Sequence, residues 1–215
     1  MLTSTYFAAL FLSQPIKSMQ EEAFECYLQS YLEVCPQLTN RELDFIRSHL
    51  SLTRLKKRDY FLKCGEIQKN MGFLYQGLLR SYYIDQHGKK VTISFVSENA
   101  YAADYPSFIQ QKPSKYYLEA LEPCTVVNLP YTAIQEAYLQ FKNFEQYGRL
   151  IAERILLKKQ ERIENFLFEN AEYRYHQFIE KNKNIINRIS LTDLSSYLGI
   201  ERQSLSRIRK KLAEA

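Results

Sequence analysis

Residues 191–212 read LTDLSSYLGIERQSLSRIRKKL, and this segment has the strongest structural signal in the sequence. A helix-turn-helix needs a small residue where its two helices cross, a glycine that permits the turn, and apolar residues that lock the pair together. Here Ser195 is the small residue and Gly199 opens the turn. The segment is therefore predicted to fold as a helix-turn-helix. Its apolar inner face consists of Leu194, Leu198, Ile200, Leu205 and Ile208.

The outer face of the predicted second helix has side chains that suit DNA. Arginine can read guanine with two hydrogen bonds, glutamine can pair with adenine, and serine and lysine can hold phosphates. Matches by spacing alone include false positives, so a second sign is needed. The residues on this face are Arg202, Gln203, Ser206, Arg207 and Lys210.

The charge distribution supplies that second sign. Residues 181–215 hold eight Lys or Arg against three acids, which accounts for the whole net charge of +5. A neutral body with a basic end indicates a module that faces a polyanion. A solvated helical tail would have the same charge, so the argument depends on its coincidence with the helix-turn-helix.

Composition excludes several other classes. The 215 residues are 46% hydrophobic and 25% charged, as in ordinary globular proteins. No apolar run approaches the roughly 18 residues of a membrane span, and residues 6–12 are too short for a signal peptide, so a cytoplasmic location is expected. No phosphate loop, nucleophile–base pairing or carboxylate pair suggests an enzyme. The cysteines lack paired spacing, so no metal is predicted and each is interpreted as a small buried hydrophobe: Cys26, Cys35, Cys64 and Cys124.

Local signals divide the rest of the chain into helices and strands. Residues 19–50 predict two helices separated at Pro36, the second capped by Thr39 with Glu42. From residue 51 to 130, short runs alternate with turn signals, which favours an antiparallel roll or barrel. Asp-Gln-His-Gly at 85–88 predicts a hairpin between residues 78–84 and 91–96. The other expected strands are 53–56, 60–63, 71–75, 116–120 and 125–129.

A long helix is predicted within residues 131–168, which contain no proline and a single glycine, Gly148. Its apolar residues recur at near-heptad spacing, which predicts that the helix packs against another helix. Dimerisation is favoured over packing within the chain. The expected interface residues are Phe144, Ile151, Ile155, Ile163 and Phe166.

In this order of elements, residues 20–212 resemble the Crp/Fnr superfamily of bacterial transcription regulators. The most specific match is residues 198–208, LGIERQSLSRI. The resemblance implies an α+β fold with an antiparallel β-roll of the cyclic-nucleotide-binding, jelly-roll type. The implied domains are an N-terminal extension (1–18), a β-roll sensor with flanking helices (19–140), a dimerisation helix (141–170) and a helix-turn-helix DNA-binding domain (171–215).

The resemblance also assigns roles on the second helix. Arg202, Gln203 and Arg207 stand where the family has Arg, Glu and Arg facing the DNA. Glutamine in place of glutamate changes the favoured base, because glutamate accepts from cytosine whereas glutamine suits adenine. The chain ends three residues after Leu212, so it resembles a shorter branch without a β-hairpin wing. The expected phosphate contacts are Ser204, Ser206, Lys210 and Lys211.

The nucleotide pocket departs from the family pattern. Members that bind cyclic AMP use a Gly-Glu pair and then an Arg-Ser pair, which fall on Ala103-Asp104 and Ser114-Lys115 here. The bidentate guanidinium is missing, and an ammonium does not reproduce its geometry, so cyclic AMP binding is not expected. A pocket for another anion is one interpretation; solvated lysines beside core tyrosines are the other. The candidate pocket residues are Asp104, Lys115, Lys158 and Lys159.

Cofactors are not expected either. The spacing of the cysteines does not match the family's iron–sulfur sensors. Surface or capping roles are favoured over haem ligation for the three histidines, His49, His87 and His176.

The leading prediction is a homodimeric, sequence-specific, DNA-binding transcription regulator with a β-roll effector domain. Its expected partners are double-stranded DNA, a second copy of the chain and a small-molecule effector, with RNA polymerase added by the resemblance and no membrane. The alternative is a ligand- or protein-interaction module of the same fold that no longer reads DNA. Salt-dependent and sequence-dependent DNA affinity distinguishes the two.

Overall fold

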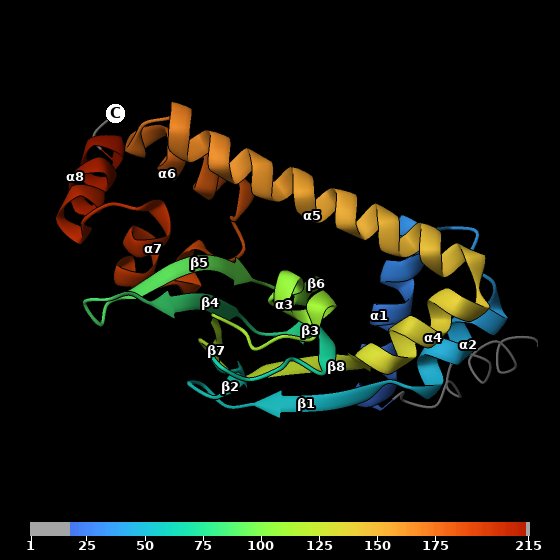
Figure 1. Ribbon diagram of the computed structural model, residues 1–215. Coiled ribbons are helices and arrows are strands. Elements are labelled where there is room, and N and C mark those ends of the chain that lie inside the picture. The colour runs from blue at the N-terminus through green and yellow to red at the C-terminus, as the bar shows by residue number, and fades with distance from the viewer. Residues whose placement is uncertain (1–17, 214–215) are drawn as a thin grey trace, which may run out of the picture.

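The computed structural model describes residues 18–213 (Figure 1). It begins with two helices, α1 (Met19–Val34) and α2 (Asn40–Ser48). Both begin with a capping box, and the box predicted for the second, Thr39 with Glu42, is present. The N-terminal extension expected over residues 1–18 lies outside the described residues, apart from Ser18, the N-cap of α1.

Two antiparallel four-stranded sheets form the β-roll, as predicted. One sheet has the order β1 (Ser51–Leu55), β8 (Cys124–Pro130), β3 (Asn70–Gln76), β6 (Ala100–Ala102). The other has the order β2 (Tyr60–Leu62), β7 (Tyr117–Ala120), β4 (Leu79–Ile84), β5 (Lys90–Val96). The expected hairpin is β4–β5. Strand β6 and the helix α3 (Tyr105–Gln110) were not predicted, because segments this short give no clear periodicity.

The predicted helix within residues 131–168 is wrong as one continuous element. It is divided into α4 (Tyr131–Gln140) and α5 (Lys142–Phe168) by Phe141, whose backbone is extended at φ −134° and ψ 115°. The Phe141 ring packs 5.4 Å from that of Phe45 and 6.1 Å from that of Phe144, measured between centroids. Tertiary packing of one aromatic ring therefore accompanies the break, in a stretch without proline.

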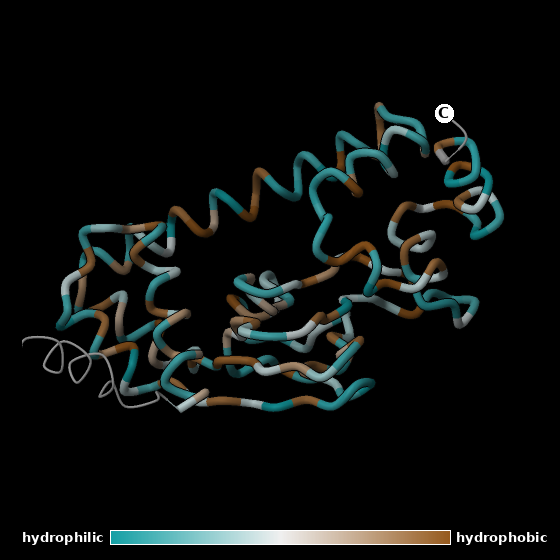
Figure 2. Tube along the Cα trace, turned by 180° about the vertical axis from the view of Figure 1, so that it is seen from behind, coloured by the Kyte–Doolittle hydropathy of each residue, from teal (hydrophilic) through white to brown (hydrophobic). Residues whose placement is uncertain are grey.

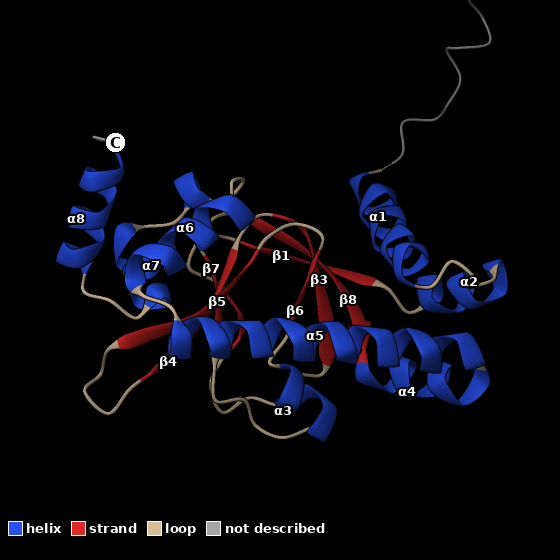
Figure 3. Ribbon diagram, turned by 90° about the horizontal axis from the view of Figure 1, so that it is seen from above, coloured by secondary structure: helices blue, strands red, loops and turns tan. Residues whose placement is uncertain are grey.

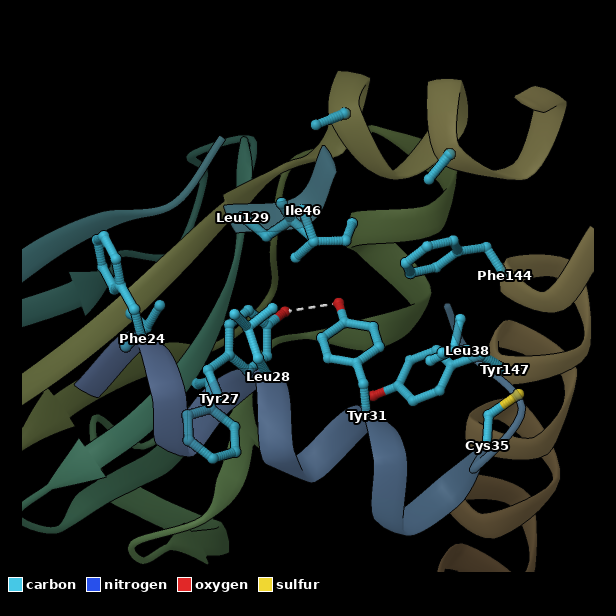
Figure 4. Close-up of a cluster of buried hydrophobic side chains, with 14 of the residues drawn as sticks. Phe24, Tyr27, Leu28, Tyr31, Cys35, Leu38, Ile46, Leu129, Phe144 and Tyr147 are labelled. Atoms are coloured by element: carbon cyan, nitrogen blue, oxygen red, sulfur yellow. Dashed lines mark hydrogen bonds between the residues drawn. The ribbon is translucent and has the colours of Figure 1, made fainter. Parts of the chain in front are cut away.

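An aromatic core joins the first sheet to the helices at one end of the molecule (Figure 4). The hydroxyls of Tyr27 and Tyr31 lie 2.9 Å apart, and the Tyr147 ring stacks on Tyr31 at 4.2 Å. Burial raises the pKa of both the Tyr27 and the Tyr31 phenol well above the ordinary value. These phenols are therefore neutral core residues at physiological pH.

Helix α5 crosses over the sheets to the opposite end, where the C-terminal elements lie (Figure 3). They are α6 (Ala171–Lys181), the 3₁₀ helix η1 (Ile186–Arg188), α7 (Leu191–Leu198) and α8 (Arg202–Ala213). We call residues 171–213 the C-terminal unit. No helix of the described chain has the length and apolar character needed to cross a membrane.

Candidate nucleic-acid interface

The C-terminal unit is built around the α7–α8 pair. Leu194, Leu198 and Leu205 are buried between the two helices and α6. Ser195, at the predicted crossing, is buried and donates its hydroxyl proton to the carbonyl of Thr192 at 3.1 Å. Gly199 ends α7 at φ 68°, in the left-handed region that glycine tolerates best. The structure thus places the apolar residues of the motif in one core.

The outer face of α8 is exposed to solvent. Arg202, Gln203 and Arg207 all lie on it, at the end of the molecule farthest from α1 and α2 (Figure 1). The Arg207 guanidinium donates to the Ser204 hydroxyl at 3.3 Å, which holds it along the helix surface. The Ser206 hydroxyl donates to the Arg202 carbonyl at 3.1 Å. The sequence-predicted residues are therefore brought together on one accessible helix.

The two lysines at the end of α8 differ in their surroundings from the arginines. Lys210 and Lys211 are both exposed. The Lys211 ammonium lies 2.9 Å from each carboxylate oxygen of Glu172 on α6. This pair is largely solvent-exposed, so separating it to reach a phosphate costs little.

A nearly buried ion pair joins the C-terminal unit to the β-roll. Arg80 of β4 contacts Asp193 of α7 at 2.5 Å, with the two side chains 8% and 15% exposed. The same guanidinium donates to the Thr92 hydroxyl at 2.9 Å and lies 4.8 Å from the ring centroid of Tyr82. Sequence reasoning missed this pair, since neither residue has a local signal that points to the other.

A second arginine reinforces the junction. Arg188 of η1 donates to Glu98 at 2.7 and 3.0 Å and to Glu122 at 2.5 and 3.3 Å. Burial acts to raise the pKa of the Glu98 carboxyl, but the hydrogen bonds from Arg188 and from backbone amides, among them that of Gly77, together with the charge of Arg188 outweigh burial, and the pKa is lowered. Glu98 is therefore ionised at neutral pH, and the guanidinium is held by two carboxylates at once.

Helix α7 also bonds directly to the backbone of β5. The Ser196 hydroxyl accepts from the Thr92 amide at 2.9 Å and donates to the Lys90 carbonyl at 3.2 Å. Apolar contacts complete the junction, because Phe95 of β5 packs against Phe178 and Tyr197 at centroid distances of 6.1 and 5.4 Å. The α7–α8 pair is thus attached along the β4–β5 hairpin.

Two further arginines attach the C-terminal unit to the end of α5. Arg162 lies 3.9 Å from the Tyr197 ring centroid and donates to the Tyr197 carbonyl at 3.0 Å. Arg174 donates to the Leu198 carbonyl at 3.3 and 3.1 Å. The ring of Phe166 lies 4.9 Å from one guanidinium carbon and 4.8 Å from the other. The Phe166 ring therefore packs at the joint between α5 and α7, within the chain.

These contacts correct part of the expected dimer interface. Phe144 is 2% exposed in the aromatic core and is unavailable to a second copy, whereas Phe166 packs at the α5–α7 joint and is still 41% exposed. Ile151 and Ile155 are half-buried, whereas Ile163 is 53% exposed. Hydrophobic segments recur along the length of α5 (Figure 2). The large exposed apolar side chains of α5 are Leu156, Leu157, Ile163, Phe166, Leu167 and Phe168.

A cavity of about 820 Å³ lies between α5, the β-roll and the C-terminal unit. Of the candidate effector residues, Asp104, Lys158 and Lys159 line it; Lys115 does not, and its side chain is exposed elsewhere. The buried Asp104 carboxylate accepts a hydrogen bond from Ser114 at 2.8 Å. The resemblance described above puts Ser114 at the position of the family's phosphate-binding arginine; in this structure its hydroxyl is bonded to Asp104.

The remaining candidate residues are the histidines and the cysteines. No group of three or more His, Cys, Asp or Glu side chains in residues 18–213 has a geometry that could hold a metal. His49 lies with Nδ1 2.8 Å from the Phe45 carbonyl, near the end of α2. The interpretation of every cysteine as buried is wrong for Cys64, which is exposed, and Cys26 is intermediate.

Comparisons with known proteins agree with this architecture. Residues 52–141 match the family model of the cyclic nucleotide-binding domain. FixK2 from Bradyrhizobium japonicum is similar at a TM-score of 0.67 and 14% identity, over 77% of this chain and 85% of that one. The c-di-GMP responsive regulator CLP of Xanthomonas campestris gives 0.64 and 13%, over 82% and 92%. The catabolite activator protein of Thermus thermophilus gives 0.54 and 15%, over 86% and 87%. A search of curated protein sequences gave no significant match.

The matches and the geometry define an architecture, in which a β-roll similar to the cyclic nucleotide-binding domain is joined through a long helix to a C-terminal helical unit. The chain shares the fold of these solved structures, as the resemblance to the Crp/Fnr superfamily implied.

Proposed function

We propose that this protein is a homodimeric, sequence-specific DNA-binding transcription regulator. Each α8 would enter a major groove, and two-fold symmetry would place two half-sites about one helical turn apart in a roughly palindromic operator. Arg202, Gln203 and Arg207 would read base edges, while Ser204, Ser206, Lys210 and Lys211 would mostly hold phosphates. The exposed outer face of α8 is the observation that carries this proposal.

Dimerisation would use the exposed apolar side of α5. Ile163 and Leu167 are four residues apart and so share one face of the helix, and both are exposed. Exposed leucine and isoleucine side chains in such numbers on one helix are typical of an interface. A second α5 would cover them in a two-helix contact.

The β-roll would respond to an effector other than cyclic AMP. Position 114 has a serine instead of an arginine that could bind a cyclic phosphate, and the serine hydroxyl is hydrogen-bonded to Asp104. Lys158 and Lys159 supply positive charge at the cavity. An anionic ligand that uses these lysines is therefore the proposed effector class.

The experiment that tests this function is selection from a randomised DNA pool with the full chain, at two salt concentrations, with sequencing of the bound fraction. Enrichment of a two-fold symmetric motif would support the proposal. If no motif is enriched, even after cell extract is added as a source of effector, the result would contradict sequence-specific DNA recognition by this protein. It would favour an interaction module.

Replacement of Arg207 by alanine tests the base-reading role. The variant is expected to lose about 1–3 kcal/mol of binding free energy on the selected site and to relax specificity, because a bidentate base contact is removed. Arg209→Ala is the matched control: it removes an arginine from the same helix that is not assigned to a base, so the ratio of specific to random affinity should hold. Equal losses on selected and random DNA for Arg207→Ala would contradict the assignment.

A further inference from the structure

The β4–β5 hairpin contacts the C-terminal unit at several places between its base and its tip. Near its base, Arg80 is paired with Asp193 of α7. Farther along, the Ser196 hydroxyl bonds to the backbone of Thr92 and Lys90. At the tip, the Lys89 ammonium lies 3.7 Å from a carboxylate oxygen of Glu201, the residue before α8. Helix α7 thus runs along the hairpin, and the start of α8 lies at the hairpin tip.

The tip itself has a defined conformation. The Asp85 carboxylate accepts from the amides of His87 and Lys89, each at 2.9 Å, and Gly88 supplies a positive φ of 77°. The Asp85 charge is therefore directed at the amides of the turn. The backbone hydrogen bond from Lys89 is the main cause of the lowered pKa of this carboxyl.

Two lysines near the tip are exposed, and Lys89 is the more exposed of them and the one beside the start of α8. Lys90 lies 3.5 Å from Glu119 and 4.6 Å from the ring centroid of Tyr82. Lys89 is 63% exposed, and its partner Glu201 is 81% exposed. An ion pair this exposed and this long is weak, so a phosphate could take the place of Glu201 at little cost.

In helix-turn-helix complexes, the N-terminal residues of the second helix reach the base edges and the first helix crosses the backbone. Lys89 is within ion-pair distance of Glu201, the residue that precedes α8. With α8 in the major groove, the Lys89 side chain would therefore lie close to the phosphates at the edge of that groove. We propose that the tip of the β4–β5 hairpin is a second DNA-contacting element, in which Lys89 binds a backbone phosphate that flanks the half-site. This inference rests on the proposed function and assigns part of the sensor domain to the DNA interface.

The salt dependence of DNA affinity tests the proposal. Each lysine–phosphate contact contributes about 0.9 to the slope of log affinity against log salt concentration. With the full chain and the DNA site selected above, Lys89→Gln should therefore flatten the slope by about 0.9 per protomer and weaken binding to related sites alike. Lys89→Arg keeps the charge and should keep the slope. Lys142→Gln removes an exposed lysine from the start of α5, at the opposite end of the molecule, and should also leave it unchanged.

The outcomes separate the two proposals. Wild-type protein that enriches a motif, together with a Lys89→Gln slope equal to that of Lys142→Gln, overturns the hairpin contact and leaves the proposed function standing. Tighter binding by Lys89→Gln overturns it too, because the tip would then hinder the DNA. Wild-type protein that binds no DNA at any salt concentration overturns both.

Discussion

Replacing Asp193 by alanine is expected to lower the free energy of unfolding by about 3 kcal/mol. Removal of one partner from a buried ion pair typically costs about 3–5 kcal/mol, because the other charge stays buried without compensation. Arg80 would keep its hydrogen bond to Thr92 and its place over the Tyr82 ring, so the lower end of that range applies. Urea denaturation of the full chain measures the change.

A matched control is available on the surface. Arg149 and Glu153 form an ion pair at 2.6 Å on α5, with side chains 60% and 53% exposed. Because such a pair contributes about 0.3–0.5 kcal/mol, Glu153→Ala should leave the unfolding midpoint almost unchanged. If Asp193→Ala and Glu153→Ala shift the midpoint equally, Arg80–Asp193 contributes no more than a solvent-exposed pair, and the junction is weaker than its geometry implies.

Replacing Gly199 by alanine is expected to destabilise the chain by about 2–3 kcal/mol. Its φ of 68° is left-handed, which costs an L-residue about 1–2 kcal/mol. A Cβ would also lie 2.8 Å from Cε1 of the Phe166 ring, so this ring, which packs against Arg162 and Arg174, would have to shift. The two costs add, because one concerns the backbone and the other the space beside it.

Gly88→Ala separates these two contributions. Gly88 has a similar φ of 77°, but a Cβ there would meet nothing within 4 Å. It should therefore show the backbone cost alone, about 1 kcal/mol less than Gly199→Ala. Thermal or urea unfolding of both variants gives the difference. Equal destabilisation by Gly199→Ala and Gly88→Ala would mean that the Phe166 ring moves aside without cost and does not stabilise the contact between α5 and α7.

Much of the secondary structure follows from local pattern. The hairpin signal at residues 85–88, the capping box at Thr39 and the apolar spacing of Leu194, Leu198 and Leu205 are each contained within a few residues, and each is present as predicted. Strand β6 and helix α3 were missed because they are too short to show a period.

The errors concern what an apolar or charged side chain contacts far along the chain. Phe144 and Phe166 have the right spacing for a dimer seam, yet one lies in the aromatic core and the other at the α5–α7 joint. Heptad spacing shows that one face of a helix is apolar, but it does not show which segment packs against that face. No local pattern predicts the contacts of four arginines that join the β-roll, α5 and the C-terminal unit, because each contact forms only when distant segments come together: Arg80, Arg162, Arg174 and Arg188.

Strand β4 has a property that follows from its pleat. Successive side chains of a strand project from opposite faces. Arg80 holds Asp193 of the C-terminal unit, and the next residue, Ser81, lines the cavity. A molecule bound in the cavity against Ser81 would therefore contact the same strand segment that holds α7, one residue away from Arg80. The cavity and helix α7 are thus in contact with two adjacent residues of one strand, Ser81 and Arg80, so a shift of this strand would be felt at both.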